Sequence, residues 1–215
     1  MNSPESSQWS AIRFYQEAEV SEKTHNRLPH WQQEGGTYFV TFRLNDSLPS
    51  ELLKEWRDER QTWLLQHPKP WSPPQEMEYH RRFSSAIDQH LDASHGSCVL
   101  RDSANADLLA QCLQYFDSDH YLLHAWVIMP NHVHILFSNA HGTDLGKTIA
   151  SWKRFSANQI QKRLGTTGGI WQKDYFDRMI RSKEHFRNVV RYIRNNPVKA
   201  NLPTGEYLRY EAPWI

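Results

Sequence analysis

The stretch Met129-Pro130-Asn131-His132-Val133-His134-Ile135-Leu136-Phe137 decides the fold that the sequence predicts. An apolar run leads up to it, a Pro-Asn pair signals a turn, and the apolar run then resumes. This pattern predicts two antiparallel strands, at about 121–129 and 132–138, joined by a tight turn. Because side chains alternate along a strand, His132 and His134 are expected on one face, while the residues between and after them face a core.

Two imidazoles on one strand face can hold a single divalent cation, since histidine is the commonest metal ligand in proteins. The pair His132 and His134 is therefore a candidate metal site. The alternative is that both are ordinary half-buried strand residues, which a bare His-x-His pattern does not exclude.

Further strands and helices flank this hairpin. Thr37–Leu44 is rich in aromatic and β-branched residues and predicts a strand, and Ser50 is expected to cap a helix that the prolines of 68–74 end. The remaining expected elements are helices at 77–91 and 107–116, a short extended piece at 96–101, a helix at 144–164, a strand at 171–181 and a helix from 182 to about 196, before Pro197. Their order predicts an α+β fold with a four-stranded antiparallel sheet and helices mainly on one face.

At 215 residues and 25.4 kDa, the chain is long enough for one substantial core and short for two. We therefore expect a single domain over 1–215, with a polar, irregular lead-in at 1–36 and a helical insert at about 68–119. No apolar run approaches the ~18 residues of a membrane helix, and the polar N-terminus carries no signal pattern, which favours a cytoplasmic protein. Cys98 and Cys112 fit no metal or redox spacing, so reduced thiols are expected.

Positive charge is concentrated near the C-terminus. Between Gly146 and Lys199 there are thirteen Lys and Arg against three acidic residues, a net charge of +10, and the rest of the chain carries −9. Aromatic residues, including Trp152 and Trp171, are interleaved with these charges. Because cations attract phosphates and bases stack on aromatic rings, this region predicts a nucleic-acid surface. A merely solvated basic face is the alternative.

The last predicted helix carries a second pair of candidate site residues. Tyr192 and Asn196 are four residues apart and therefore share one helix face. If that face packs beside the central hairpin, the Asn196 carbonyl joins the two histidines around one cation, and Tyr192 points at whatever the cation binds. Taken alone, the pair also fits a half-buried tyrosine and an asparagine that caps the helix end.

These motifs together resemble a known family. His132-Val133-His134, in its context, resembles the HUH motif of single-tyrosine transposases, and Tyr192-Ile193-Arg194-Asn195-Asn196-Pro197-Val198-Lys199-Ala200 resembles the tyrosine motif of REP-associated tyrosine transposases. Three shorter pieces match in order, namely Tyr38 to Leu44, Ser151 to Phe155, and Trp171-Gln172 through Asp177-Arg178. The resemblance covers roughly 35–202 and departs at Asn201, where family members often have Gly.

The resemblance implies a ferredoxin-like HUH endonuclease fold and an enzyme that cleaves and rejoins single-stranded DNA. Tyr192 would be the catalytic nucleophile that forms a 5′-phosphotyrosine, and His132, His134 and Asn196 would hold Mg²⁺ or Mn²⁺. The DNA would be a hairpin of an imperfect palindromic (REP) repeat with a short flanking guide sequence, bound by a nucleoid-associated monomer or homodimer. The residues expected to contact this DNA are Lys153, Arg154, Arg178, Arg181 and Lys199.

Two other functions stay open. A plasmid replication initiator or relaxase would use the same chemistry, although the Asn-Asn-Pro-Val-Lys-Ala context argues against it. A non-catalytic module that binds single-stranded nucleic acid would use the same sheet, although the presence of both histidines and Tyr192 makes it less attractive.

Overall fold

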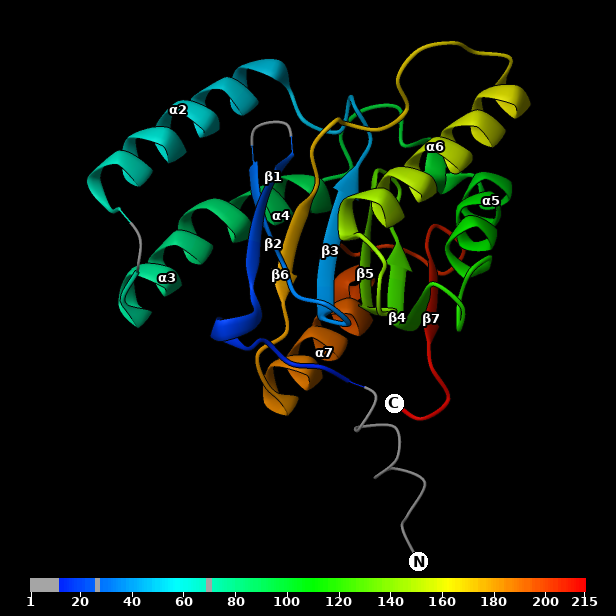
Figure 1. Ribbon diagram of the computed structural model, residues 1–215. Coiled ribbons are helices and arrows are strands. Elements are labelled where there is room, and N and C mark those ends of the chain that lie inside the picture. Colours follow the sequence, from blue (N-terminus) through cyan, green and yellow to red (C-terminus); the bar gives the residue numbers. More distant parts are fainter. Residues whose placement is uncertain (1–11, 26–27, 69–70) are drawn as a thin grey trace, which may run out of the picture.

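A five-stranded antiparallel sheet in the order β6-β3-β5-β4-β7 forms the centre of the computed structural model (Figure 1). The structure describes residues 12–25, 28–68 and 71–215. The strands of this sheet are β3 (Thr37–Arg43), β4 (Tyr121–Ile128), β5 (His132–Asn139), β6 (Phe176–Met179) and β7 (Leu208–Glu211). The predicted α+β class and antiparallel sheet are confirmed, and β7 adds a fifth strand to the expected four.

Helices pack against both faces of the sheet rather than mainly one (Figure 1). The helical elements are η1 (Glu17–Glu19), α2 (Ser50–Gln66), α3 (Pro73–Tyr79), the π-helical η2 (His80–Ser84), α4 (Ser85–Asp92), η3 (Val99–Arg101), α5 (Ser103–Gln114), α6 (Leu145–Leu164) and α7 (Lys183–Lys199). Alternate strand residues such as Val40 and Ile135 form one core with α5 and α6, and the opposite set, including Val127 and Leu136, forms a second core with α7.

The central hairpin forms as the sequence predicts. The Met129 amide donates to the carbonyl of His132 at 2.9 Å, so Pro130 and Asn131 make the turn between β4 and β5. Every residue of β5 is buried, because this strand lies in the middle of the sheet with β3 and β4 on its two sides. The register places Thr41 of β3 directly beside His134.

Helix α7 continues through Pro197 to Lys199, so the expectation that it ends near Asn196 is wrong. A proline costs the helix one amide donor, but here it lies in the last turn and is buried, so packing offsets the loss. Asn201 follows with a left-handed φ of 52°, which explains why glycine or asparagine suits this position.

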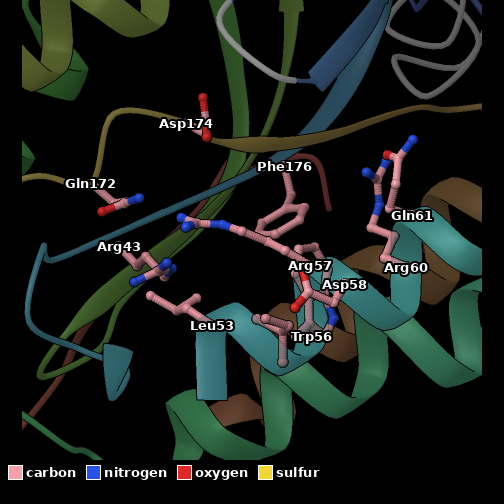
Figure 2. A pocket seen from close by; sticks show the side chains of 11 residues that line it. Arg43, Leu53, Trp56, Arg57, Asp58, Arg60, Gln61, Gln172, Asp174 and Phe176 are labelled. Carbon is pink, nitrogen blue, oxygen red and sulfur yellow. The ribbon is translucent and has the colours of Figure 1, made fainter. Parts of the chain in front are cut away.

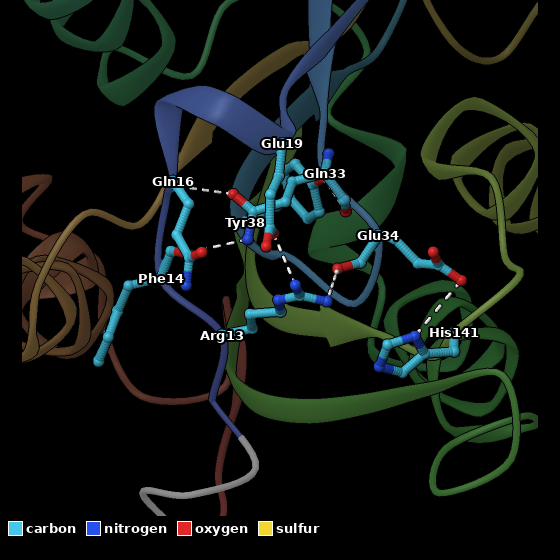
Figure 3. Close-up of polar contacts among 8 residues, drawn as sticks. All are labelled: Arg13, Phe14, Gln16, Glu19, Gln33, Glu34, Tyr38 and His141. Carbon is cyan, nitrogen blue, oxygen red and sulfur yellow. Dashed lines mark hydrogen bonds and ion pairs between the residues drawn. The ribbon is translucent and has the colours of Figure 1, made fainter.

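The lead-in is more regular than expected, although its residues 1–11 lie outside the described ranges. Strands β1 (Ser21–His25) and β2 (Leu28–Gln32) pair as an antiparallel hairpin beside β6. The side chain of Gln33 accepts from the Gln16 amide at 2.7 Å and donates to the Phe14 carbonyl at 3.0 Å (Figure 3). The Tyr38 hydroxyl bonds to both backbone groups of Gln33, so β3 anchors this segment to the sheet.

Three other sequence expectations need correction. The helix expected at 77–91 is divided among α3, the π-helical η2 and α4, and the extended piece expected at 96–101 contains the turn η3. The strand expected at 171–181 is regular only over β6, because the segment before it packs as a loop against α6. That 1–215 forms a single domain, with an insert at 68–119, stays a prediction.

Candidate active site

His132 and His134 project from β5 toward α7, as their spacing predicts. Their Nε2 atoms lie 3.1 Å apart, and neither side chain is exposed to solvent. Two nitrogen ligands at right angles around a cation, each about 2.1 Å from it, would lie ~3 Å apart. The spacing of the pair therefore fits two ligands of one metal ion.

Two further residues fix how these imidazoles are oriented. The Asn131 amide donates from Nδ2 to the His95 carbonyl at 3.1 Å, so its oxygen faces His132 Nδ1 at 2.7 Å and accepts the proton there. The hydroxyl of Thr41 lies 2.7 Å from His134 Nδ1 and can accept from it in the same way. With both Nδ1 atoms engaged, the Nε2 lone pairs are left to point at each other, an arrangement typical of metal-binding histidines.

Burial also sets the charge of the pair. It lowers the pKa of His132 to about 3, with a smaller contribution from Lys199, and it lowers the pKa of His134 well below the ordinary value. Both imidazoles are therefore neutral near pH 7, which is the form that ligates a metal.

Tyr192 lies directly against this pair. Its phenolic oxygen is 3.4 Å from His134 Nε2, and its ring meets that of Phe39 edge-on at 5.7 Å. Phe39 in turn stacks on His134 at 5.5 Å, so one aromatic ring from β3 positions both the candidate nucleophile and the candidate ligand.

Asn196 lies one turn after Tyr192 and is 1% exposed. Neither polar atom of its side chain makes a hydrogen bond within the part of the chain that the structure describes. The cap at the end of α7 uses the Asn196 carbonyl of the backbone, which accepts from Ala200, and not the amide side chain. A buried amide without a partner is costly and requires a ligand or another explanation, so the donor set fits a cation held by two imidazoles and this amide.

The two histidines are not joined by a third His, Cys, Asp or Glu ligand among the described residues. Within the described ranges, no three His, Cys, Asp or Glu side chains gather so that they could hold a metal ion. Any cation at His132 and His134 would therefore need a neutral oxygen such as that of Asn196, together with water or substrate oxygens.

Tyr175, the alternative candidate for the nucleophile, lies elsewhere. It packs in the core on the α6 side of the sheet and stacks on His30 at 4.2 Å. Burial raises the pKa of its phenol far above the ordinary value, and the ring is remote from the histidine face. Tyr192 is thus the tyrosine that the fold brings to the candidate metal site.

The five residues expected to bind DNA fall on two faces. Lys153 and Arg154 lie on α6, at a groove of about 820 Å³ between this helix and the 168–175 loop. The groove also contains Lys147 and Lys173, with Asp144 as its one acidic lining residue. Two of the three hydrogen-bond donors of the Lys153 ammonium are already used, because they donate to the carbonyls of Gln172 and Lys173 at 2.6 and 2.7 Å.

The other three residues do not line this groove. Arg178 is paired with Phe39 in the sheet register and so shares the face of His134. Lys199 forms an ion pair with Asp92 of α4 at 2.8 Å, and Arg181 lies 5.3 Å from the ring of Tyr15. The structure thus places Lys153 and Arg154 at the α6 groove and the other three candidate DNA-binding residues outside it.

Several site residues were missed from the sequence. Phe39 and Thr41 are two residues apart on the first predicted strand and therefore share a face. Only the register with β5 shows that both contact His134. Asn131 was assigned only to the turn, although its position next to His132 allows the contact. Asp92 lies in the insert, and nothing local to it indicates Lys199 as its partner.

Comparisons with known proteins agree with the resemblance seen in the motifs. Residues 97–196 match the family described as "Transposase IS200 like". A REP-associated tyrosine transposase of Escherichia coli (strain K12) is 31% identical over 80 residues, which span 36% of this chain and 44% of that protein. The aligned region is thus less than half the length of the relative. The resemblance predicted from the sequence is confirmed.

Among solved structures, a REP-associated tyrosine transposase bound to a REP hairpin aligns over 82% of this chain and 73% of that one. The two share 19% sequence identity, with a TM-score of 0.39. Across the described residues, none of the helices has the length and apolar character needed to cross a membrane.

Proposed function

We propose that this protein cleaves and rejoins single-stranded DNA by forming a covalent 5′-phosphotyrosine on Tyr192. The observation that carries the proposal is the position of the Tyr192 phenol, 3.4 Å from His134 Nε2, which is itself 3.1 Å from His132 Nε2. A nucleophile that adjoins a pair of neutral imidazoles is suited to metal-assisted phosphoryl transfer, because the imidazoles can hold the metal ion beside the attacked phosphate.

His132, His134 and Asn196 are the residues that would hold a divalent ion, Mg²⁺ or Mn²⁺. When bound, the ion would polarise the scissile phosphate and neutralise part of its charge. Two observations support this assignment. The Asn196 side-chain amide has no hydrogen-bond partner among the described residues, and the Nδ1 atom of each histidine is within hydrogen-bond distance of a neighbouring side chain. Asn131 and Thr41 act as positioning residues, because each fixes the ring orientation of one imidazole.

The bond changes at Tyr192 follow from this arrangement. The phenolic oxygen bonds to phosphorus, the bond from phosphorus to the 3′ oxygen breaks, and the phosphate stays joined to the 5′ oxygen. The phenol gives its proton to solvent, and the leaving 3′ oxygen takes one up. The phosphotyrosine retains the energy of the phosphodiester, so a 3′-hydroxyl can later reverse the step without ATP.

The substrate we propose is a hairpin of an imperfect palindromic repeat with single-stranded flanks. The printed name of the Escherichia coli relative supports a REP element, and the basic groove beside α6 supplies a surface for a nucleic-acid backbone. We also propose that the protein is associated with the nucleoid and acts as a monomer or a homodimer.

An oligonucleotide assay tests this function. A labelled single strand that carries an imperfect palindrome from the DNA flanking the gene is incubated with protein and Mn²⁺, with and without a chelator. The proposal predicts a nicked product whose 3′ end a polymerase can extend and whose 5′ end is blocked by protein. Tight binding without any nick would favour a non-catalytic module, and equal nicking of substrates without a palindrome would favour an initiator or relaxase.

A further inference from the structure

A second cavity lies next to the histidine pair and is not used by the chemistry above. Its volume is about 290 Å³, and it is formed where α2 packs over the ends of β3 and β6 (Figure 2). The lining residues that matter here are Arg43, Arg57, Trp56, Phe176 and Asp174.

Two side chains that line this cavity lie on the same face of the sheet as the candidate active site. Arg43 of β3 is the direct register partner of His132 in β5, and paired residues of neighbouring strands project from the same face. Phe176 of β6 is paired with Thr41, the residue that holds His134. A polymer bound at the histidine pair can therefore continue along this face of the sheet toward the cavity.

Two guanidinium groups meet in this cavity. Figure 2 shows the Arg57 side chain reaching from α2 across the cavity toward Arg43 and Gln172. Arg43 is only 5% exposed, and burial together with the charge of Arg57 lowers its pKa to about 10, although the nearby Asp174 carboxylate acts in the opposite direction. Among the residues that the structure describes, no carboxylate pairs with Arg57. Two like charges in a partly desolvated space repel each other, and a bound anion would relieve that repulsion.

Aromatic rings and an unused acceptor complete the cavity. The ring planes of Trp56 and Phe176 are perpendicular, with their centroids 5.8 Å apart. Both rings line the cavity. One carboxylate oxygen of Asp174 is buried and makes no hydrogen bond with any described residue. A base can stack on such a ring, and its amino group can donate to such an oxygen.

We propose that this cavity binds one nucleotide of the single strand that flanks the scissile phosphate, with Arg43 and Arg57 on its phosphate and Phe176 and Trp56 against its base. This assignment rests on the proposed function for the identity of the polymer. It gives α2 a role in substrate binding, since Arg57 and Trp56 are both on that helix.

Binding measurements with chemically modified DNA test the cavity. The protein carries Tyr192→Phe to prevent cleavage, and the probe is the hairpin oligonucleotide with one phosphate at a time replaced by a neutral methylphosphonate. We expect one position in the single-stranded flank at which neutralisation weakens binding roughly tenfold, as loss of a charged hydrogen bond does. Adding Arg57→Gln should weaken binding to the unmodified probe by a similar factor and remove the sensitivity at that position alone.

Lys54→Gln is the matched control, because Lys54 lies on the same helix, is exposed and does not line the cavity. It should leave the sensitivity at every position unchanged. An abasic site at the same nucleotide should weaken binding less in Phe176→Leu than in the parent protein. Arg57 is itself exposed, so its substitution is expected to leave the fold intact, which circular dichroism verifies.

The outcomes separate this inference from the proposed function. If Arg57→Gln retains every phosphate sensitivity of the parent, the cavity assignment is wrong while the cleavage chemistry is unaffected. If the sensitivity disappears as expected but the protein with Tyr192 forms no covalent adduct, the cavity assignment holds and the proposed reaction fails. Absence of binding to all of the probes would overturn both.

Discussion

The carboxylate of Asp92 lies 2.8 Å from the ammonium of Lys199, and the two residues end helices α4 and α7 respectively. Asp92 is largely buried, with a side chain only 10% exposed, whereas Lys199 is half-exposed. This contact joins the helical insert to the helix that carries Tyr192. It also neutralises a lysine that we expect to contact DNA, so the pair must loosen when a phosphate approaches.

Replacing Asp92 with Asn should therefore strengthen DNA binding. The change frees the Lys199 cation and removes a negative charge, so the slope of log affinity against log salt should steepen by about 0.7, the value for one phosphate contact on a single strand. Fluorescence anisotropy at several salt concentrations measures both quantities. Asp107→Asn, which makes the same charge change on the exposed face of α5, is the control. It should change neither the DNA affinity nor the salt slope. Equal slopes for the two variants would remove Lys199 from the DNA-binding set.

Asn196→Ala should weaken the binding of Mn²⁺ without destabilising the metal-free protein. The buried side chain has no hydrogen-bond partner among the described residues, so its removal costs packing but relieves an unsatisfied amide. If the side chain were a helix cap, its loss would instead cost about 1 kcal/mol. Calorimetric titration with Mn²⁺ and thermal melting of the same sample distinguish the two roles. The neighbouring exposed Asn195→Ala should match the parent in both. A lowered melting temperature with unchanged Mn²⁺ affinity would leave only the two histidines as ligands.

His132→Gln and His134→Gln should each abolish both Mn²⁺ binding and metal-dependent cleavage, because their Nε2 atoms converge on one point. A third buried strand histidine provides the control. His124 also has no exposed surface, but its Nε2 bonds to Ser138 at 2.8 Å and its ring contacts Phe186 and Trp214. His124→Gln should therefore keep Mn²⁺ affinity, even if its melting temperature falls as much as in the other two. Loss of Mn²⁺ binding in all three variants alike would indicate a general effect of destabilisation.

Lys153 and Arg154 should respond differently to pH. Burial lowers the pKa of Lys153 to about 8, so this side chain carries its charge at pH 7 and loses it by pH 9. DNA affinity of the parent protein should accordingly fall as the pH rises through 8, whereas Lys153→Gln should give a flatter profile. Arg154→Gln should keep the pH dependence of the parent and lower the salt slope by about 0.7. Parallel pH profiles for all three proteins would mean that Lys153 does not contact the DNA.

Patterns that are local in the sequence predicted which candidate site residues share a face. The alternation of β5 fixes the common face of His132 and His134, and the helical spacing of α7 fixes that of Tyr192 and Asn196. Neither the strand periodicity nor the helix periodicity shows which residues of other elements contact these side chains. The contact of Thr41 with His134 spans 93 residues and depends on strand register, and the contact of Lys199 with Asp92 depends on how the insert folds back.

The same limit applies to the fold. Strand β7 has only four residues and is stabilised by pairing with β4, so its own sequence carries little signal. The end of α7 was placed too early because Pro197 is unfavourable locally, whereas the helix is held by its buried contacts. The cavity around Arg43 and Arg57 joins the consecutive elements β3 and α2 to Ile87 of α4 and to residues 172–176, and only the folded structure brings these distant parts together.

Covalent capture of DNA tests the central claim, that Tyr192 is the nucleophile, most directly. The parent protein, Tyr192→Phe and Tyr175→Phe are each incubated with the labelled hairpin oligonucleotide and Mn²⁺, denatured, and resolved by electrophoresis, and the adducted peptide is identified by mass spectrometry. The account predicts a labelled adduct at Tyr192 in the parent and in Tyr175→Phe if that protein folds, and none in Tyr192→Phe, which should still bind the DNA. An adduct that persists in Tyr192→Phe, or one whose peptide contains Tyr175, would contradict it.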